Sequence, residues 1–532
     1  MPGKIHKYHT IIINFKIIMK KTKLFFCLFI CLLASNLTAQ KTSLNGSPIV
    51  IVKDPNIWVL EDSKDRLVFG AVSHDLMAGY DDLWLYYYNK SSKTTESQKF
   101  DDNLEGRFAY LKDGIVHLIG VRNNNKTKSL DYVDGTIQEG SGTVKKMPFT
   151  TKCSVPYEKH KLYFNQFAFS PDKSKIAILT VLHPKSNSDI SHIQDVAVFD
   201  LNGEMLYHHR QNVNYQINYN SPILVSNDGV AYIAEYGCAE NVRRNISDSL
   251  HISVYSEKGI VNITDFFGTK SEFRCAKALL NDGRLAVSGV VCNNGKSSGV
   301  LSTYLVSEDG NFDLVKSPVN LPIDAEDYVY NGAQYHDSVD RFLPYIHEIK
   351  ELPDGKIMLI GELNYRDIIG QVISLTGPSY WIRGYLSRNL YKIMLSSDGK
   401  VTDVGTYPRA TVTTEVYSMY FRVNTPGVFI RNNDVYLLFN DHKDNFDNNH
   451  QRLWTVLNNN RAGETVVVLS KVEKNNSLSC DVIYTAQPYP FPRQAIYTNH
   501  YEFFDRILTT DEDAVYYILK HDNEYRLETI TW

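Results

Sequence analysis

The sequence has few cysteines, and their spacing matches neither a disulfide framework nor a zinc site. Seven occur among 532 residues, and none forms a Cys-x-x-Cys pair. Two of them, Cys27 and Cys31, lie in an apolar segment near the N-terminus. The other five are scattered and odd in number, so buried free thiols are the simplest interpretation.

Motifs of the common cofactor and hydrolase folds are also missing. The chain contains no phosphate-binding loop and no His-Glu-x-x-His pair, and no nucleophile elbow leads from a strand into a helix. Helical periodicity is nearly absent, so no Gly-x-Gly-x-x-Gly turn leads from a strand into a helix. These absences argue against nucleotide-dependent enzymes and α/β-hydrolases, and they leave a protein built almost entirely from strands.

Acidic residues are missing from residues 1–39, which carry six lysines and an apolar run over 24–33. This layout predicts a secretory signal peptide over 1–39, with translation starting at Met19 and a mature domain over 40–532. A retained membrane anchor is the alternative, but the run is shorter than the ~20 residues that span a bilayer. We therefore expect export to the periplasm, the cell surface or the medium, without a stable transmembrane anchor.

Removal of that segment makes the chain more acidic. The six lysines leave with it, and the net charge of −4 becomes −10. Because nucleic-acid binding depends on Lys and Arg that neutralise phosphates, we expect no nucleic-acid partner. The mature chain exceeds the usual limit of ~250–300 residues for one core, which favours a repeat architecture.

A short turn rich in Asp and Gly returns eight times, and an apolar run follows each copy. Such a period, built from hairpins, is typical of a β-propeller. The eight copies occupy 61–72, 111–121, 170–182, 226–236, 280–291, 352–363, 431–441 and 509–520.

Seven of these units continue into a second pair of runs across a second turn, which in the second unit is the Asp-Gly pair at 134–135. Each unit therefore predicts a four-stranded blade. The last unit ends after three runs, whereas the run over 47–52 has no partner of its own. Pairing that run with the last unit would remove a free sheet edge. The sequence thus predicts an all-β fold, a single propeller with eight four-stranded blades closed by the N-terminal strand; seven blades plus a terminal hairpin is the alternative.

The turns at 170–178, 280–286 and 352–358, which read SPDKSKIAI, LNDGRLA and LPDGKIM, resemble those of WD40- and TolB-like β-propellers. The resemblance is at superfamily level, covers 47–532, and implies the fold without an activity. The chain lacks the Trp-Asp dipeptide, the kelch Gly-Gly pair and the sialidase Asp-box. A sialidase or a kelch-type oxidase is therefore disfavoured.

The long insertions should share one face of the ring. In a four-stranded blade the two tight turns lie on one face, and the connections that join second to third strands and successive blades lie on the other. Long loops of a compact domain commonly carry function. The site is therefore expected on the face formed by 320–346, 364–389, 409–427, 440–463 and 487–502.

Polar side chains at the exits of second strands are candidates for catalysis. Glu235 and Glu362 follow strongly apolar runs, so burial could raise their pKa values toward the range of a general acid. Arg366 and His442 lie at equivalent exits and complete the catalytic candidates, should the protein be an enzyme. The alternative is that each group is hydrogen-bonded within its own blade.

The same face carries candidate binding residues. Aromatic rings beside arginines would suit a sugar ring or a peptide, and they would equally pin loops to the blades. These candidates are His74, Arg122, His183, Tyr380, Trp381 and Tyr385.

One Asp- and Asn-rich segment, 439–450, offers oxygen ligands to a hard cation. Asp441, Asp444 and Asp447 could bind Ca²⁺, although the spacing matches no EF-hand loop. Such a loop more often caps its own backbone, so no cofactor is expected beyond this possible ion.

With no catalytic signature visible, the leading expectation is an exported, monomeric propeller that binds a glycan, a peptide or a cell-envelope partner on its long-loop face. The alternative is a polysaccharide-active hydrolase or lyase with its site at the mouth of the central channel.

Overall fold

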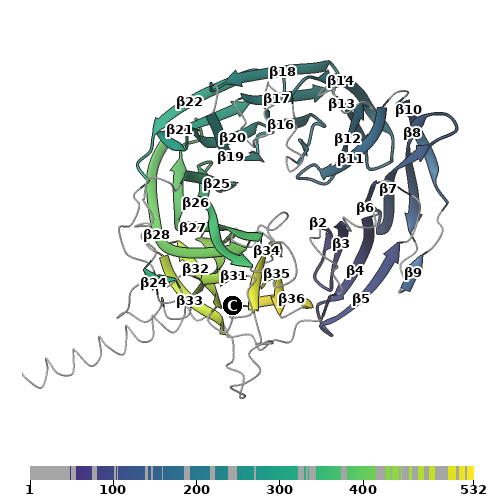
Figure 1. The fold of residues 1–532 in the computed structure, drawn as a ribbon. Helices are drawn as coiled ribbons and strands as arrows, with labels where there is room; N and C mark the ends of the chain where they lie inside the picture. The colour runs from purple at the N-terminus through teal and green to yellow at the C-terminus, as the bar shows by residue number, and fades with distance from the viewer. Residues whose placement is uncertain are drawn as a thin grey trace, which may run out of the picture.

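The computed structural model shows an all-β ring of sheets (Figure 1). Among the described residues, no helix is long and apolar enough to cross a membrane. The structure describes residues 48–49, 56–74, 81–100, 104, 106–137, 142–144, 148–157, 160–184, 192–215, 222–237, 249–268, 271–321, 329–330, 333–334, 343–372, 380–414, 426–432, 434–442, 445, 455–457, 465–472, 478–485, 501–510, 514–521 and 524–531.

Eight sheets of four or five strands follow one another around the ring, and we number them as blades in chain order. Blade 1 contains β2 (Asn56–Asp62), β3 (Arg66–His74), β4 (Asp81–Asn89) and β5 (Thr94–Phe100). Blade 2 contains β6 (Gly106–Lys112), β7 (Ile115–Asn124), β8 (Ser129–Ile137) and β10 (Thr150–Pro156). Blade 3 contains β11 (His160–Phe169), β12 (Lys175–Pro184), β13 (His192–Asp200) and β14 (Met205–Val213). Blade 4 contains β15 (Leu224–Val225), β16 (Ala231–Gly237), β17 (Ser249–Ser256) and β18 (Gly259–Phe266).

The second half of the ring repeats this order. Blade 5 contains β19 (Ser271–Leu279), β20 (Leu285–Asn293), β21 (Lys296–Val306) and β22 (Phe312–Pro318). Blade 6 contains β25 (Leu343–Glu351), β26 (Ile357–Val372), β27 (Tyr380–Leu395) and β28 (Val401–Thr414). Blade 7 contains β29 (Gly427–Arg431), β30 (Asp434–His442), β32 (Thr465–Val472) and β33 (Leu478–Thr485). Blade 8 contains β34 (Tyr501–Thr510), β35 (Ala514–His521) and β36 (Glu524–Thr531). Between blades 5 and 6, β23 (Val329–Tyr330) and β24 (Ala333–Gln334) form a separate hairpin.

The N-terminal strand completes the last blade, as the sequence predicts. The short strand β1 (Pro48–Ile49) pairs with β36, with Pro48 opposite Arg526 and Ile49 opposite Tyr525. The order β1-β36-β35-β34 gives blade 8 its fourth strand from the other end of the chain. The ring is thus closed by backbone hydrogen bonds between its first and last strands.

Each blade is held to the next by its own hydrophobic cluster. Alternate side chains of every strand face the preceding and the following blade, since strands have a period of two. One cluster joins blades 3 and 4 through Val196, Ile233 and Tyr255, and another joins blades 8 and 1 through Ile518 and Phe69. Clusters of this kind fill all eight junctions of the ring.

The Asp/Gly turns close the first two strands of a blade, and glycine is the usual residue at their position of positive φ, which Lys173 occupies in blade 3. In the turn of blade 5, Gly283 has a φ of +86° and its N–H donates to the carbonyl oxygen of Leu280 at 3.0 Å. The Asp282 carboxylate accepts a hydrogen bond from the N–H of Arg284 at 3.1 Å. Only glycine adopts such a left-handed conformation without steric strain, which explains why the motif recurs.

One predicted turn is wrong. The Asp-Gly pair at 134–135 was expected to join the third and fourth strands of blade 2, but β8 continues through it to Ile137. A Cβ atom at Gly135 would lie 2.7 Å from the carbonyl oxygen of Pro148, so this glycine permits a close approach between chain segments. The fourth strand of the blade is β10, and the intervening β9 (Gly142–Val144) pairs in parallel with β5 of blade 1.

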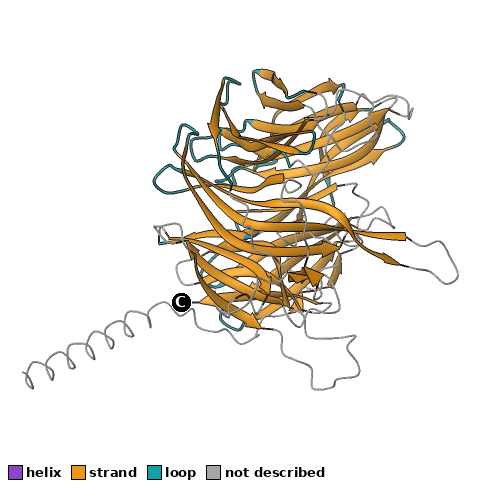
Figure 2. Cartoon of the chain, turned by 60° about the vertical axis from the view of Figure 1, so that its left-hand side comes forward, coloured by secondary structure: helices purple, strands orange, loops and turns teal. Residues whose placement is uncertain are grey.

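The insertion predicted as a loop over 364–389 is largely sheet. Strands β26 and β27 stay paired as far as Val372 and Tyr380, and this longest hairpin projects from the ring (Figure 2). Strand β28 follows the hairpin to Thr414, where β31 (Thr455–Leu457) pairs with it in parallel. The expected loop face therefore carries an extension of blade 6.

Candidate functional site

A polar cluster caps the hydrophobic junction between blades 3 and 4. On β16, Ala231 and Ile233 face blade 3 within the apolar cluster, and Glu235 continues the same alternation. The Glu235 side chain is 1% exposed. A buried carboxyl needs hydrogen-bond partners, and the neighbouring strands supply them.

Two glutamines connect Glu235 to the outer strands. The Gln194 amide donates from Nε2 to Oε2 of Glu235 at 2.9 Å. Its oxygen, Oε1, accepts from the Tyr255 hydroxyl and from Nε2 of Gln211, each at 2.9 Å. Strand β13 thus places Gln194 between the carboxyl and two donors that point toward it.

An aromatic pair lies on the other side of Glu235. The Tyr215 side chain hydrogen-bonds to the Glu235 carboxyl. Its ring stacks on the His251 ring, with centroids 3.8 Å apart and planes inclined by 6°. His251 lies directly opposite Glu235 in the pairing of β16 with β17, and both aromatic side chains are half-buried.

The cluster holds Glu235 near the balance between its two protonation states. Burial raises the pKa of Glu235 to about 7, while the charge of Lys277 and the hydrogen bonds from Tyr215 and Gln194 act in the opposite direction. The Lys277 ammonium donates to the carbonyl oxygen of Ala234, the residue before Glu235, at 3.0 Å. Burial, reinforced by the charge of Glu235, raises the pKa of Tyr215, which keeps the phenol protonated.

A second polar cluster, at the junction of blades 6 and 7, contains an ion pair. Oε1 of Glu362 lies 2.6 Å from Nη1 of Arg409, and the two side chains are 1% and 2% exposed. Arg409 also donates from Nε to the carbonyl oxygen of Asn440 at 2.9 Å, while Nε2 of His347 lies 3.8 Å from the other oxygen of Glu362. Burial alone would raise the pKa of Glu362, but the Arg409 charge and His347 hold this pKa below its usual value.

Asp441 and His442, both predicted as site residues, directly follow Asn440, whose carbonyl oxygen binds Arg409 of this ion pair. Asp441 is fully buried and accepts hydrogen bonds from the His442 backbone N–H and the Asn445 side chain, both at 2.8 Å. The Tyr407 hydroxyl donates to its other oxygen at 3.3 Å. The other predicted calcium ligands, Asp444 and Asp447, lie outside the described residues. Within the described part of the chain, no three His, Cys, Asp or Glu side chains are grouped as metal ligands would be.

The structure does not bring the four catalytic candidates into one cluster. Glu235 lies at the junction of blades 3 and 4, whereas Glu362 and His442 belong to the junction of blades 6 and 7. Arg366 is on β26, four residues beyond Glu362, and its side chain is outside the described part of the structure.

The predicted binding residues are spread around the ring. Arg122 lies over the Phe149 ring, and the His183 ring lies 5.6 Å from that of His192. The backbones of the remaining four lie in strands, but their side chains are outside the described part of the structure: His74 ends β3, and Tyr380, Trp381 and Tyr385 lie in β27.

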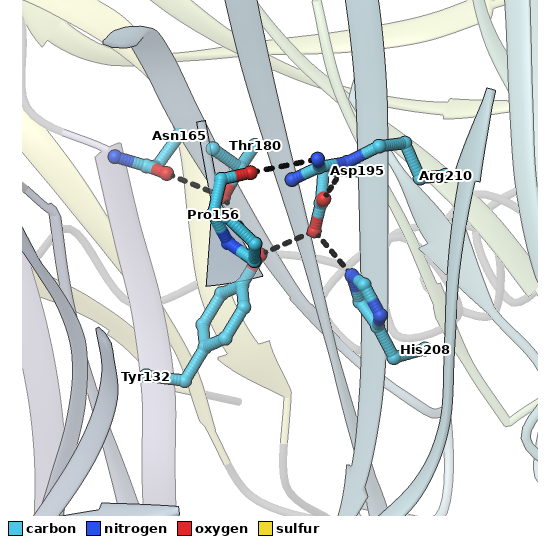
Figure 3. A network of polar contacts seen from close by, with 7 residues as sticks. All are labelled: Tyr132, Pro156, Asn165, Thr180, Asp195, His208 and Arg210. Atoms are coloured by element: carbon cyan, nitrogen blue, oxygen red, sulfur yellow. Dashed lines mark hydrogen bonds and ion pairs between the residues drawn. The ribbon is translucent and has the colours of Figure 1, made fainter. Parts of the chain in front are cut away.

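A third network shows what the sequence reading missed. Asp195 adjoins Gln194 on β13, so it faces the opposite side, toward blade 2. It accepts hydrogen bonds from the Tyr132 hydroxyl at 2.8 Å, His208 at 2.7 Å and Arg210 at 2.8 Å (Figure 3). Although burial opposes ionisation, His208 and Arg210 lower the pKa of Asp195.

Sequence reasoning also missed Tyr215, His251, Gln194 and Lys277, and it did not foresee that Arg409 pairs with Glu362. Each of them joins its cluster from a strand or segment distant in sequence from the glutamate. Only His251 could have been found from the sequence, because the correct register of the two neighbouring strands places it directly opposite Glu235.

Neither a protein-family model nor a curated protein sequence matches the chain. Several solved structures align with the chain at low identity. The polysaccharide lyase Uly1 aligns with 93% of this chain and 94% of its own, at 10% identity and a TM-score of 0.38. The β-propeller domain of the Trilobed protease from Pyrococcus furiosus covers 66% of this chain and 92% of its own, at 10% identity and a TM-score of 0.27. An α-L-arabinanase from Penicillium chrysogenum, complexed with arabinobiose, covers 70% and 94%, at 11% identity and a TM-score of 0.32.

Proposed function

We propose that this propeller is an acid–base enzyme that cleaves polysaccharides, with its site at the junction of blades 3 and 4. The observation that supports it most directly is Glu235, a buried carboxyl whose pKa is raised to about 7 and which is hydrogen-bonded to a half-buried tyrosine. A group that exchanges protons near neutral pH is what general acid–base catalysis requires.

Tyr215 is the member of the pair that touches the substrate, because Glu235 is buried behind it. In the protonated state, Glu235 transfers its proton to the Tyr215 oxygen as Tyr215 gives its own proton to the glycosidic oxygen. The O–H bonds of Glu235 and Tyr215 break, those of Tyr215 and the leaving group form, and Glu235 ends as a carboxylate. The bond between carbon and the glycosidic oxygen breaks in the same step. Water attack completes this step as a hydrolysis, and loss of an adjacent carbon-bound proton completes it as an elimination. In either case the released proton passes through Tyr215 to the Glu235 carboxylate, which restores the starting state.

The neighbouring groups prepare this transfer. Parallel stacking on His251 fixes the plane of the Tyr215 ring, which aims its hydroxyl. The Lys277 cation stabilises the carboxylate that remains on Glu235 after the proton leaves. The aromatic and arginine residues expected on the long-loop face, such as Trp381 and Arg383, favour saccharide rings as the substrate.

The test is turnover of a panel of neutral and acidic polysaccharides by the purified protein. New reducing ends report cleavage, and ultraviolet absorbance of an unsaturated sugar distinguishes elimination from hydrolysis. Tyr215→Phe and Glu235→Gln should each lower kcat by about 10²–10⁴-fold. Tyr232→Phe is the matched control, because its hydroxyl bonds to the carbonyl oxygen of Gly283 on the opposite face of the same strand.

Cleavage that survives both Tyr215→Phe and Glu235→Gln contradicts the proposal. Retention of a glycan without any cleavage contradicts it too, and would instead support a binding protein of the cell envelope.

A further inference from the structure

We propose that Gln194 is a positioning residue that confines the exchangeable proton of Glu235 to one carboxyl oxygen, Oε1. This inference rests on the proposed function for its catalytic meaning, but the contacts that carry it are those of the resting protein.

The direction of the Gln194 amide is determined by the groups around it. An amide oxygen only accepts hydrogen bonds and an amide nitrogen only donates them. Oε1 of Gln194 meets the Tyr255 hydroxyl and the Gln211 amide nitrogen, each at 2.9 Å. If the amide were reversed, its nitrogen would face the Gln211 nitrogen and its oxygen would face the Glu235 carboxylate.

The Tyr255 hydroxyl could in principle accept a hydrogen bond, but its accepting side is already used. Nε2 of Gln211 donates to the Tyr255 oxygen at 2.6 Å, so the phenolic hydrogen points to Gln194. Gln211 is oriented in turn by Asn262, whose Nδ2 donates to the Gln211 oxygen at 3.0 Å. Ser253 completes the ring of contacts by donating to the Asn262 oxygen at 2.7 Å.

The result is a chain of hydrogen bonds with one direction. It starts at Asn262 on the exposed outer strand β18, passes through Gln211 and Gln194, and ends at Oε2 of Glu235. Because Oε2 accepts the Gln194 N–H, a proton on that oxygen would make it a poorer acceptor and weaken this hydrogen bond. The acid proton of Glu235 therefore resides on Oε1, where the other groups that act on the carboxyl can exchange it.

The titratable and charged groups around Glu235 come from three strands and one loop. Tyr215 follows β14, and the others are His251 and Tyr255 on β17, Lys277 on β19, His192 on β13 and, beyond Tyr255, Asp195 on β13.

The decisive experiment is a titration of Glu235 by NMR with isotope-labelled glutamate carboxyl carbons, assigned by the resonance lost in Glu235→Gln. Gln194→Met should raise the Glu235 midpoint by about one pH unit, a tenfold change in proton affinity, because the carboxylate loses a donor. Gln211→Met is the matched control and should move the midpoint much less, because the Tyr255 hydroxyl can still donate to the Gln194 oxygen and the Glu235 carboxylate still favours the Gln194 nitrogen over its oxygen.

An unchanged midpoint in Gln194→Met overturns the proposal, as does an equal shift in Gln211→Met. If Gln194→Met does not fold, Gln194→Asn serves in its place: its shorter amide cannot reach both Tyr255 and Glu235, so the same shift is expected. Because this readout needs no substrate, a shifted midpoint without any polysaccharide cleavage retains the positioning role and rejects the enzymatic function. When cleavage is measurable, the pH–rate profile should move with the NMR midpoint.

Discussion

Glu235 and Glu362 occupy equivalent places in two blades and behave in opposite ways. Both lie on the second strand of a blade after an apolar run, and both side chains are 1% exposed. Burial raises the pKa of Glu235 to about 7, whereas Arg409 and His347 hold the pKa of Glu362 below its usual value. The comparison shows that the charged partner, rather than the local sequence, decides whether a buried carboxyl exchanges protons or stays ionised.

The largest expected effect comes from removing the partner of Glu362. Arg409→Met leaves a buried, unpaired carboxylate and should lower the free energy of unfolding by about 3–5 kcal/mol at neutral pH. Urea unfolding followed by circular dichroism measures this loss. A change below about 1 kcal/mol would show that the ion pair is not what distinguishes Glu362 from Glu235.

Glu235 and Glu362 should affect the free energy of unfolding with opposite dependences on pH. The folded pKa of Glu235, about 7, exceeds its unfolded value near 4.5. Ionisation of Glu235 therefore lowers the free energy of unfolding progressively as the pH rises from about 4.5 to about 7, and the loss reaches about 3 kcal/mol above that range. The folded pKa of Glu362 is lowered, so its contribution is present above pH 4.5 and is lost as the pH falls through the folded value.

Unfolding titrations of Glu235→Gln and the unmodified protein, between pH 4 and pH 8, measure the first dependence. The variant should become more stable relative to the unmodified protein as the pH rises. Parallel curves would mean that Glu235 is not buried as a proton-exchanging group.

Removing both members of the ion pair should be much milder than removing one. Glu362→Leu combined with Arg409→Met replaces the pair by apolar side chains of similar size, and its stability should lie within about 1–2 kcal/mol of the unmodified protein. The same unfolding assay applies. If the double variant is as unstable as Arg409→Met alone, packing around Arg409, and not the unpaired charge, explains the loss.

The smallest effect is expected at an exposed pair on the opposite face of the ring. Nζ of Lys356 lies 2.6 Å from Asp354, and both side chains are 52% exposed. Solvent screens such pairs, so Lys356→Met should change the free energy of unfolding by less than about 0.5 kcal/mol. This variant calibrates the assay against Arg409→Met, in which a cation is also replaced by methionine.

The fold could be predicted from the sequence because its determinants are local. Each Asp/Gly turn and the apolar runs beside it are contiguous, and the unpaired run at the N-terminus matched the missing strand of the last unit. The Gly135 error has the same origin: an Asp-Gly pair reads as a turn, although here its glycine makes room for the Pro148 carbonyl. The extension of blade 6 could not be seen, because its residues carry no apolar alternation that separates strand from loop.

The candidate site could be predicted only in part. Glu235 and Glu362 stand out locally, because each ends an apolar run. Their pKa values differ because their partners come from other strands. Arg409 contacts Glu362 from β28, while Gln194 and Lys277 act on Glu235 from blades 3 and 5. Those contacts depend on the register of paired strands and on the order of the blades, which cannot be deduced from a single sequence.

The pairing of β1 with β36 also bears on how the molecule assembles. Most blades form from hairpins whose strands are close in sequence, but blade 8 must recruit Pro48 and Ile49 across nearly the whole described chain. Contacts of such long sequence separation carry the highest entropic cost and form late in folding. The ring can therefore close only after the last blade has been synthesised, so a chain interrupted during synthesis would expose the edge of an open sheet to proteases and to other chains.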